Sequence, residues 1–199
     1  IKGESGRILS LAVDSTGTTV ASGSNKGALQ LWTIDSNEND TPSLQPYRTL
    51  VDVVSRINTL AFHPTNPAIL ISGNQEGLLE IWNIDQAQVI QPLDDSADRI
   101  VSVAISNHGQ YIACGSNFAV ADVAFSPDGT LLASSSYDES IRTWDWSQGR
   151  ARCTLEGHSG FVYSVDFTDS GNTLISGGYD GTVRTWDLTA TSNQDCLPR

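Results

Sequence analysis

The chain of 199 residues lacks methionine altogether and is poor in basic residues. Lysine and arginine together number 11 against 23 aspartates and glutamates, so the net charge is −12 at pH 7. Such a charge argues against a surface that binds nucleic acid or another polyanion. No apolar run approaches the roughly 18 residues that a membrane span needs, and the first residues do not form a secretion signal. We therefore expect a cytoplasmic protein that binds neither nucleic acid nor membrane.

Cysteine is scarce as well, with Cys114, Cys153 and Cys196 far apart and no C-x-x-C pair. This arrangement suits neither a disulfide framework nor a zinc site, so we expect reduced thiols. The missing methionine, absent even at position 1, indicates a piece of a longer protein. What is present, 39% hydrophobic residues and five tryptophans, is enough for a globular core.

A repeat of β-prone segments runs through the sequence. Each copy begins with a short apolar strand, continues through a tight turn and enters a second strand. The first strands are predicted at 8–13, 57–62, 100–105, 120–125 and 162–167, and the second at 19–22, 69–72, 111–115, 131–134 and 173–176. The last residue of each turn is expected to take a positive φ, these residues being Gly17, Asn66, Gly109, Gly129 and Gly171.

A third strand ending in tryptophan follows in four of the five copies, at Trp32, Trp82, Trp144 and Trp186. Two residues later each copy has an apolar position, which predicts that Trp146 belongs to the core and is not a platform for a ligand. Fourth strands are predicted at 88–93 and 151–155, and the polar segment 36–46 is predicted to be a solvated loop. Four short antiparallel strands per repeat make a propeller blade.

The last copy contains Gly157-His158, Tyr179-Asp180-Gly181 and Trp186-Asp187, and it resembles the repeats of the WD-repeat β-propellers. The resemblance implies an all-β fold of four-stranded antiparallel blades, incomplete in this chain, and seven blades in the intact protein. Residues 1–199 then form one portion of a propeller, with repeats at 1–50, 51–93, 94–117, 118–155 and 156–199.

The third of these repeats is interrupted. The first strands start 49, 43, 20 and 42 residues apart, whereas this kind of repeat has a period of about 40 to 45. A half blade would leave sheet edges and apolar faces open. We therefore predict that about 23 residues of the repeat are missing between Asn117 and Phe118, which are not covalent neighbours in the natural protein.

The resemblance also implies a structural tetrad, a hydrogen-bonded set formed by His158, Ser176, Asp180 and Trp186. A histidine, an aspartate and a serine could instead form a hydrolase triad, but the tetrad explains the spacing and places the hydroxyl inside a blade. The sequence has no G-x-S-x-G elbow, Walker A loop or H-E-x-x-H motif. We predict no catalytic residue, no cofactor and no metal site.

Arginine recurs immediately before the first strand in three successive repeats, at Arg7, Arg56 and Arg99. Equivalent positions of a propeller form a ring at one end of its central channel, the rim. Two interpretations stand: ordinary solvated arginines, or an anion-accepting patch. In the second, the aromatic residues Tyr137, Phe161 and Tyr179 continue the same arc.

The leading interpretation is a non-catalytic scaffold or sensor module of a larger intracellular signalling protein. It would bind a partner protein or peptide, acidic or phosphorylated, or other domains of its own chain, at the rim. Two alternatives come from other classes: an enzyme, such as a hydrolase, with its site at the central channel, and a purely structural subunit of an assembly.

Overall fold

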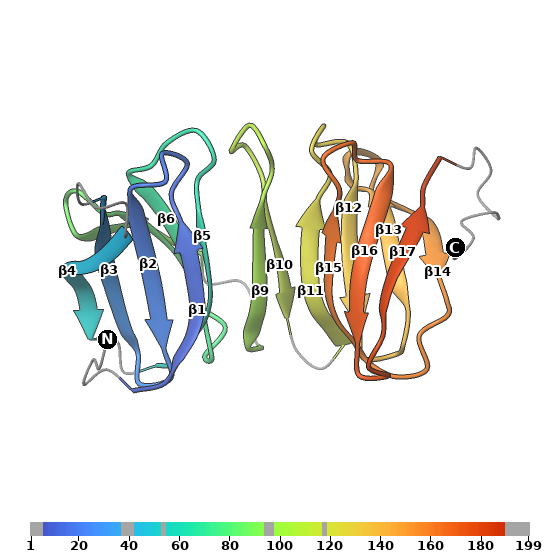
Figure 1. Ribbon diagram of the computed structural model, residues 1–199, viewed down its shortest axis with the longest axis horizontal. Coiled ribbons are helices and arrows are strands. Elements are labelled where there is room, and N and C mark those ends of the chain that lie inside the picture. Colours follow the sequence, from blue (N-terminus) through green and yellow to red (C-terminus); the bar gives the residue numbers. More distant parts are fainter. Residues whose placement is uncertain (1–5, 37–41, 53–54, 94–97, 117–118, 190–199) are drawn as a thin grey trace. The chain divides into compact units, whose positions relative to one another are not determined.

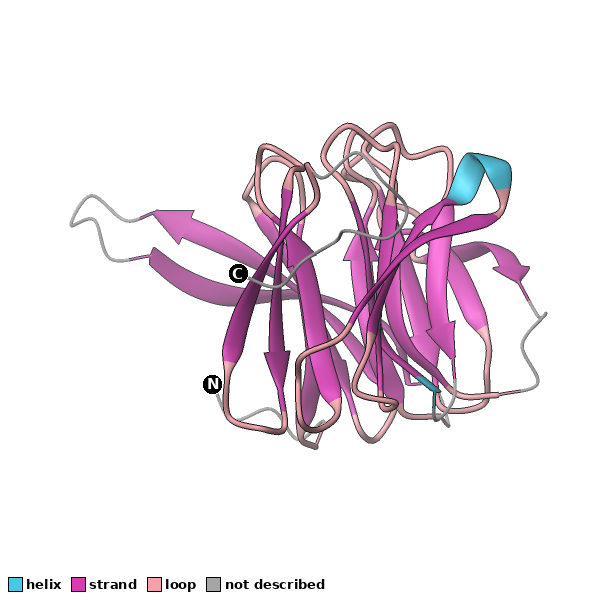
Figure 2. Cartoon of the chain, turned by 90° about the vertical axis from the view of Figure 1, so that its right-hand side faces the viewer, coloured by secondary structure: helices cyan, strands magenta, loops and turns pink. Residues whose placement is uncertain are grey.

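The computed structural model describes residues 6–36, 42–52, 55–93, 98–116 and 119–189. Within these ranges the regular structure is antiparallel strand, apart from short 3-10 segments such as η2 (Trp146–Gln148) (Figure 2). The predicted all-β class is confirmed. The chain forms two compact units, Ile1–Val103 and Ala104–Arg199.

The first unit contains two four-stranded sheets (Figure 1). One has the order β1-β2-β3-β4, and the other has the order β5-β6-β7-β8. Their strands are β1 (Ile8–Val13), β2 (Thr19–Ser24), β3 (Ala28–Ser36), β4 (Pro42–Asp52), β5 (Ile57–Phe62), β6 (Ile69–Asn74), β7 (Leu79–Asn83) and β8 (Gln88–Leu93). Strands consecutive in sequence are neighbours in each sheet, which is the order predicted for a blade.

The second unit contains a four-stranded sheet in the order β11-β12-β13-β14 and a three-stranded sheet in the order β15-β16-β17. The strands are β11 (Val120–Phe125), β12 (Leu132–Ser136), β13 (Ile141–Asp145), β14 (Arg150–Leu155), β15 (Val162–Phe167), β16 (Thr173–Gly178) and β17 (Val183–Asp187). The interrupted repeat is a two-stranded sheet of β9 (Ile100–Ile105) and β10 (Ile112–Ser116). The predicted gap at Asn117–Phe118 lies outside the described residues.

Polar side chains fix the turns between first and second strands. In the first turn the Asp14 carboxylate accepts the N–H groups of Thr18 and Thr19 at 2.9 and 3.0 Å. The glycines predicted to take a positive φ do so, at 71° for Gly17, 72° for Gly109, 70° for Gly129 and 70° for Gly171. Asn66 does not have a positive φ, so that expectation is wrong. Its turn is longer and is held by His63, whose Nδ1 accepts the N–H of Asn66 at 3.2 Å.

In the polar segment 36–46, predicted to be a loop, Ser36 and residues 42–46 belong to strands, and residues 37–41 lie outside the described residues. β3 and β4 pair over a long hairpin, with Trp32 opposite Pro46 and Ser36 opposite Pro42. The loop prediction followed from polarity and proline content, but both are compatible with a hairpin that is exposed to solvent. The pairing of β2 with β3 ends at Thr19 and Thr33, and the hairpin of β3 and β4 continues past this point. The order of the strands in the sheet is therefore the predicted one.

Glycine at one position of the second strand lets the first strand of the next sheet approach closely. A Cβ atom on Gly23 would lie 2.6 Å from Ile57, one on Gly73 would lie 2.5 Å from Ile100, and one on Gly115 would lie 2.9 Å from Val120. Each unit has a hydrophobic core, which contains the buried Trp82 in the first unit and the buried Trp186 in the second. Sequential sheets within a unit therefore share one core.

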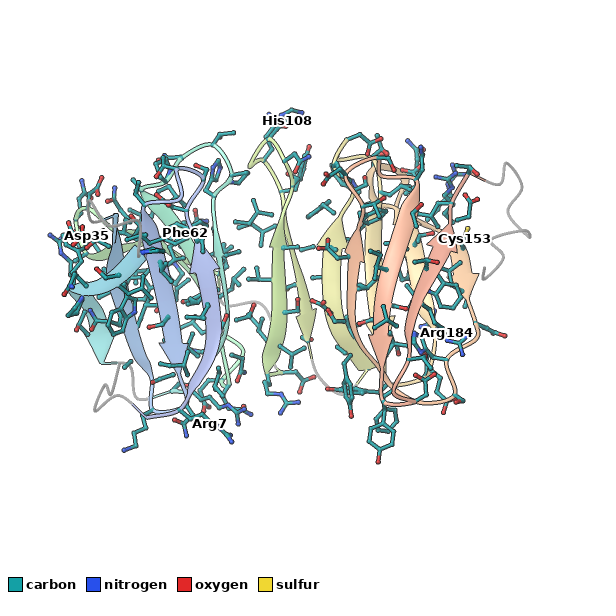
Figure 3. The ribbon with its side chains drawn as sticks, viewed as in Figure 1. Arg7, Asp35, Phe62, His108, Cys153 and Arg184 are labelled. Carbon is teal, nitrogen blue, oxygen red and sulfur yellow. The ribbon has the colours of Figure 1, made fainter. Side chains whose placement is uncertain are left out.

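Cys153 lies on β14 (Figure 3) and is disulfide-bonded, whereas Cys114 is a free thiol. The expectation of reduced thiols is thus wrong for Cys153. Wide spacing in the sequence did not exclude pairing, because the fold decides which cysteines meet.

Candidate functional site

The four residues of the structural tetrad are joined by hydrogen bonds. The indole N–H of Trp186 donates to Ser176 Oγ at 2.9 Å, and this hydroxyl lies 2.8 Å from Nε2 of His158. His158 Nδ1 lies 2.9 Å from Asp180 Oδ2. If the imidazole is neutral and protonated on Nδ1, each polar group in this series, from the indole to the carboxylate, has a hydrogen-bond partner.

Hydrogen bonds keep Asp180 ionised. The Thr182 hydroxyl and the Thr182 N–H donate to its Oδ1 at 2.7 and 3.0 Å. The N–H of Ser159 donates to its Oδ2 at 3.0 Å. These bonds outweigh burial, which acts in the opposite direction, and hold the pKa of the Asp180 carboxyl well below its usual range. An ionised carboxylate can only accept, so it fixes the proton of His158 on Nδ1.

Burial separates this set from a hydrolytic triad. Ser176 is 2% exposed and His158 is 6% exposed. A substrate carbonyl has no approach to a hydroxyl that lies beneath an imidazole and an indole within the sheet. The geometry therefore gives the set a structural role, in which each member satisfies a buried polar neighbour.

The tryptophan-to-serine bond recurs in every blade that has the tryptophan. The indoles of Trp32, Trp82 and Trp144 donate to the hydroxyls of Ser22, Ser72 and Ser134 at 2.8, 2.9 and 3.0 Å. These serines were not singled out from the sequence. A serine ten residues before each tryptophan is the signal that could have found them.

The histidine has a replacement in the other blades. At the position of Gly178, the last residue of β16, the earlier sheets have Ser24, Asn74 and Ser136. The Asn74 side chain accepts the N–H groups of Glu76 and Leu78 at 2.9 and 3.0 Å, and Ser24 accepts those of Lys26 and Ala28. The turn is thus held by the strand end in the sheets with Ser24 and Asn74, and by Asp180 in the last sheet. In the sheet between them both Ser136 and Asp138 hold it.

Two positions meet at one end of each sheet: the residue before the first strand, called the strand-start residue, and the residue after the second strand, called the bend residue. The N–H of the bend residue donates to the carbonyl of the strand-start residue. The pairs are Asn25 with Arg7 at 2.9 Å, Gln75 with Arg56 at 2.9 Å, Tyr137 with Ala119 at 3.2 Å, and Tyr179 with Phe161 at 2.8 Å. Their side chains therefore lie next to each other in each blade.

The three predicted arginines belong to the first unit. Arg7 is exposed and lies at the end of its sheet where β1 begins (Figure 3). Arg56 is exposed at the equivalent position before β5, and Arg99 is half-buried before β9. Within this unit the strand-start and bend positions are thus basic or amide side chains.

The second unit has aromatic side chains at three of these positions, and Ala119 at the fourth. Tyr137 and Phe161 have ring centroids 5.3 Å apart, and those of Phe161 and Tyr179 are 6.1 Å apart. The structure adds Tyr163 of β15, which lies 6.2 Å from Tyr137 and 6.3 Å from Tyr179. Sequence reasoning missed Tyr163, although an aromatic residue at the second position of a first strand occurs in no other repeat.

Trp146 is half-buried, so its assignment to the core is wrong. The residue lies in η2, its indole N–H donates to the Gly129 carbonyl at 3.0 Å, and its ring lies 4.3 Å from that of Tyr111. Ile84 and Leu188, at the same position of other repeats, are buried. Ile34, also at this position, is half-buried like Trp146. The indole covers the turn at Gly129 and lines a groove of about 500 Å³.

Other kinds of site were sought in the described residues. His, Cys, Asp and Glu do not gather there in threes with the geometry to hold a metal ion. Among the elements that the structure describes, no helix has the length and apolar character to cross a membrane.

Comparison with known proteins gives one family. The sequence profile described as "WD domain, G-beta repeat" matches residues 1–33, 116–145 and 149–187. The matched segments contain the structural tetrad and three of the four tryptophans at the third strand.

Similar proteins include the "Chromatin assembly factor 1 subunit FAS2 homolog" of Oryza sativa subsp. japonica, which is 27% identical over 79% of this chain and 29% of its own length. The "Nuclear distribution protein nudF 1" of Talaromyces marneffei is 29% identical over 55% of the chain and 29% of its own length. The "Pre-mRNA-processing factor 19" of Bos taurus is 22% identical over 63% of the chain. The matches thus span about three tenths of each relative, 29%, 29% and 30%.

Proposed function

Because this chain belongs to the family of WD-repeat proteins, we propose that it is a non-catalytic protein-binding module of a larger cytoplasmic signalling protein. The relatives' names, which refer to chromatin assembly, nuclear distribution and pre-mRNA processing, support a role in assemblies. A buried Ser176 supports the absence of catalysis by the tetrad.

The observation that carries the proposal is the pairing of strand-start and bend residues in four repeats. The paired backbone is the same in these four sheets, while the paired side chains are arginine with an amide in the first two, alanine with tyrosine in the third and phenylalanine with tyrosine in the fourth. A constant frame with variable side chains at one end is suited to recognition. This arrangement supports our proposal that the partner binds at these residues.

The arginines give the partner its chemistry. Arg7 and Arg56 are exposed on a chain whose net charge is −12, so they are local exceptions to its acidic surface. Guanidinium groups bind carboxylates and phosphates through two parallel hydrogen bonds. We assign Arg7, Arg56 and Arg99 to an acidic or phosphorylated segment, and the aromatic residues Tyr137, Phe161 and Tyr179 to further contact with the partner.

Charge reversal tests this assignment. The probe is a fluorescein-labelled decapeptide of aspartate, glycine and phosphoserine, and the variant combines Arg7→Glu, Arg56→Glu and Arg99→Glu. Fluorescence anisotropy is expected to show at least tenfold weaker binding by the variant, and weakening of the parent's binding by added salt. The control reverses the exposed Arg150 and Arg152 of β14, which should leave the affinity within about twofold. Equal binding by the parent and the triple variant would contradict the proposal.

A further inference from the structure

Four aromatic side chains of the second unit form an exposed aromatic cluster: Tyr137, Phe161, Tyr163 and Tyr179. They come from two neighbouring sheets, since Tyr137 follows β12 and the other three flank or belong to β15 and β16. Phe161 is 46% exposed, Tyr163 is 48% exposed and Tyr179 is 73% exposed. The cluster therefore holds a fixed ring arrangement while its rings still face solvent.

The fold does not require these rings. At the position of Tyr163 the other first strands have Leu9, Asn58, Val101 and Ala121, and at the bend position of Tyr179 the first unit has Asn25 and Gln75. The sheets β1-β2-β3-β4 and β5-β6-β7-β8 form without an aromatic residue at either place. Exposed aromatic groups gathered from separate segments mark a binding surface.

Three of the rings stand steeply to one another. The planes of Tyr137 and Phe161 make an angle of 80°, those of Tyr137 and Tyr163 make 78°, and those of Phe161 and Tyr163 make 72°. Their centroids are 5.3, 6.2 and 6.5 Å apart. Rings at such distances gather several aromatic faces in one place, and an aromatic face attracts a cation that lies within about 6 Å of its centroid.

The surrounding charge selects the ligand. Residues 104–199 contain 11 acidic and 5 basic side chains. Glu139, two residues after Tyr137, is exposed and belongs to this excess of acidic side chains. Asp138 beside it is ionised, since its hydrogen bonds hold the pKa of this carboxyl below its usual range against the effect of burial, but it is paired with the Arg142 guanidinium at 2.8 Å. An acidic field around aromatic faces favours a cation. The first unit shows the same preference on a small scale, with the Arg48 guanidinium 5.1 Å from the ring centroid of Tyr47.

We propose that the aromatic cluster binds an arginine or lysine side chain on a basic segment of a partner protein. This inference rests on the proposed protein-binding function and adds a second ligand chemistry to it, on different residues from the arginines. The two can fail separately, because the arginine assignment is tested with an acidic peptide and the aromatic cluster with a basic one.

The probe is a fluorescein-labelled decapeptide with four arginines in a glycine–serine background. A matched peptide has citrulline in place of arginine, which keeps the shape of the side chain and removes its charge. Anisotropy is expected to give at least tenfold tighter binding of the arginine peptide. Tyr179→Leu should weaken its binding by about two- to fivefold, and Phe161→Leu with Tyr179→Leu by about tenfold.

Matched variants separate ring chemistry from general attraction to an acidic protein. Tyr163→Phe keeps a ring and should retain the affinity, whereas Tyr163→Leu should not. Tyr47→Leu, at a tyrosine 51% exposed in the first unit, should have no effect. If Tyr163→Leu lowers the melting temperature, its loss of affinity does not separate binding from folding. Tyr179→Leu then tests whether the ring is needed for binding, because Tyr179 is the most exposed of the four rings.

Three results would overturn the proposal. One is equal binding of the arginine and citrulline peptides. Another is unchanged affinity in the double leucine variant, which would assign the binding to long-range charge alone. The third is tighter binding of a single-stranded oligothymidylate of ten nucleotides, which would mean that the rings stack on bases.

Discussion

At the scale of single residues, the structural tetrad depends on a residue outside it. Gly178 ends β16, and a Cβ atom there would lie 2.6 Å from His158 Nδ1 and 3.0 Å from Asp180 Oδ1. The imidazole cannot swing aside, since both of its nitrogens are hydrogen-bonded. A side chain at position 178 is therefore incompatible with the imidazole of His158 in its present place.

This exclusion predicts the effect of Gly178→Ala. The added methyl group should displace His158 and lower the free energy of unfolding by about 1 to 3 kcal/mol. Gly177→Ala is the matched control, because a Cβ atom on Gly177 meets nothing within 4 Å, and it should stay within about 1 kcal/mol of the parent. Thermal or urea unfolding of the two variants measures the difference. Equal stabilities would mean that the tetrad gives way without cost.

At the scale of elements, equivalent strands differ in what covers them. Leu11 of β1 is 65% exposed, whereas Leu60, at the same register position of β5, is 7% exposed. The contrast has a simple cause: Leu60 faces Gly23 of the preceding sheet. No described sheet precedes β1 in the sequence. Burial of a first strand is thus supplied by its neighbour and not by its own sheet.

A pair of substitutions tests this dependence. Leu60→Ala should lower the free energy of unfolding by about 2 to 5 kcal/mol, the usual cost of a cavity at a buried leucine. Leu11→Ala should change it by less than about 0.5 kcal/mol. The measurement is urea denaturation followed by tryptophan fluorescence. A large loss in Leu11→Ala would show that β1 is covered in solution by something within the chain.

The elements also show what a sequence can and cannot predict. All five first strands are found at the predicted residues, because apolar periodicity and turn residues are local signals. The hairpin of β3 and β4, the turn at Asn66 and the place of Trp146 were mispredicted, since each depends on which strand or ring lies opposite. The same holds for the candidate site. The positions of the strand-start arginines and of the aromatic residues can be predicted from the repeat, whereas the contact of Tyr163 with Tyr137 depends on packing between two sheets.

At the scale of the whole molecule, two apolar faces are open among the residues that the structure describes. On β1, Ile8, Leu11 and Val13 are 42%, 65% and 55% exposed. On the sheet β15-β16-β17, Ile175 is 40% exposed and Val183 is 76% exposed, although their equivalents Ile71 and Leu79 are 1% and 6% exposed. These are the positions that a neighbouring sheet covers elsewhere, so each face is complementary to a sheet of the same kind.

Electrostatic repulsion between copies opposes the covering of these faces by a second copy of the chain. At pH 7 a charge of −12 keeps copies apart, and near the isoelectric point of about 4.4 this repulsion disappears. The fold should survive there. The pKa of Asp180 is lower in the folded chain than its ordinary value of 3.8, so the stability that this carboxylate contributes is present above that pH and is lost only as the pH falls below it.

We therefore predict reversible association of the chain near pH 4.5 and a monomer at pH 7, measured by sedimentation velocity. Leu11→Ser with Val183→Ser should reduce the association at pH 4.5, because both faces lose apolar area. Ile90→Ser is the control, because Ile90 of β8 is 53% exposed but belongs to neither face. This variant should associate like the parent. Equal association of all three proteins would assign it to charge neutralisation alone, and the open faces would then have no part in it.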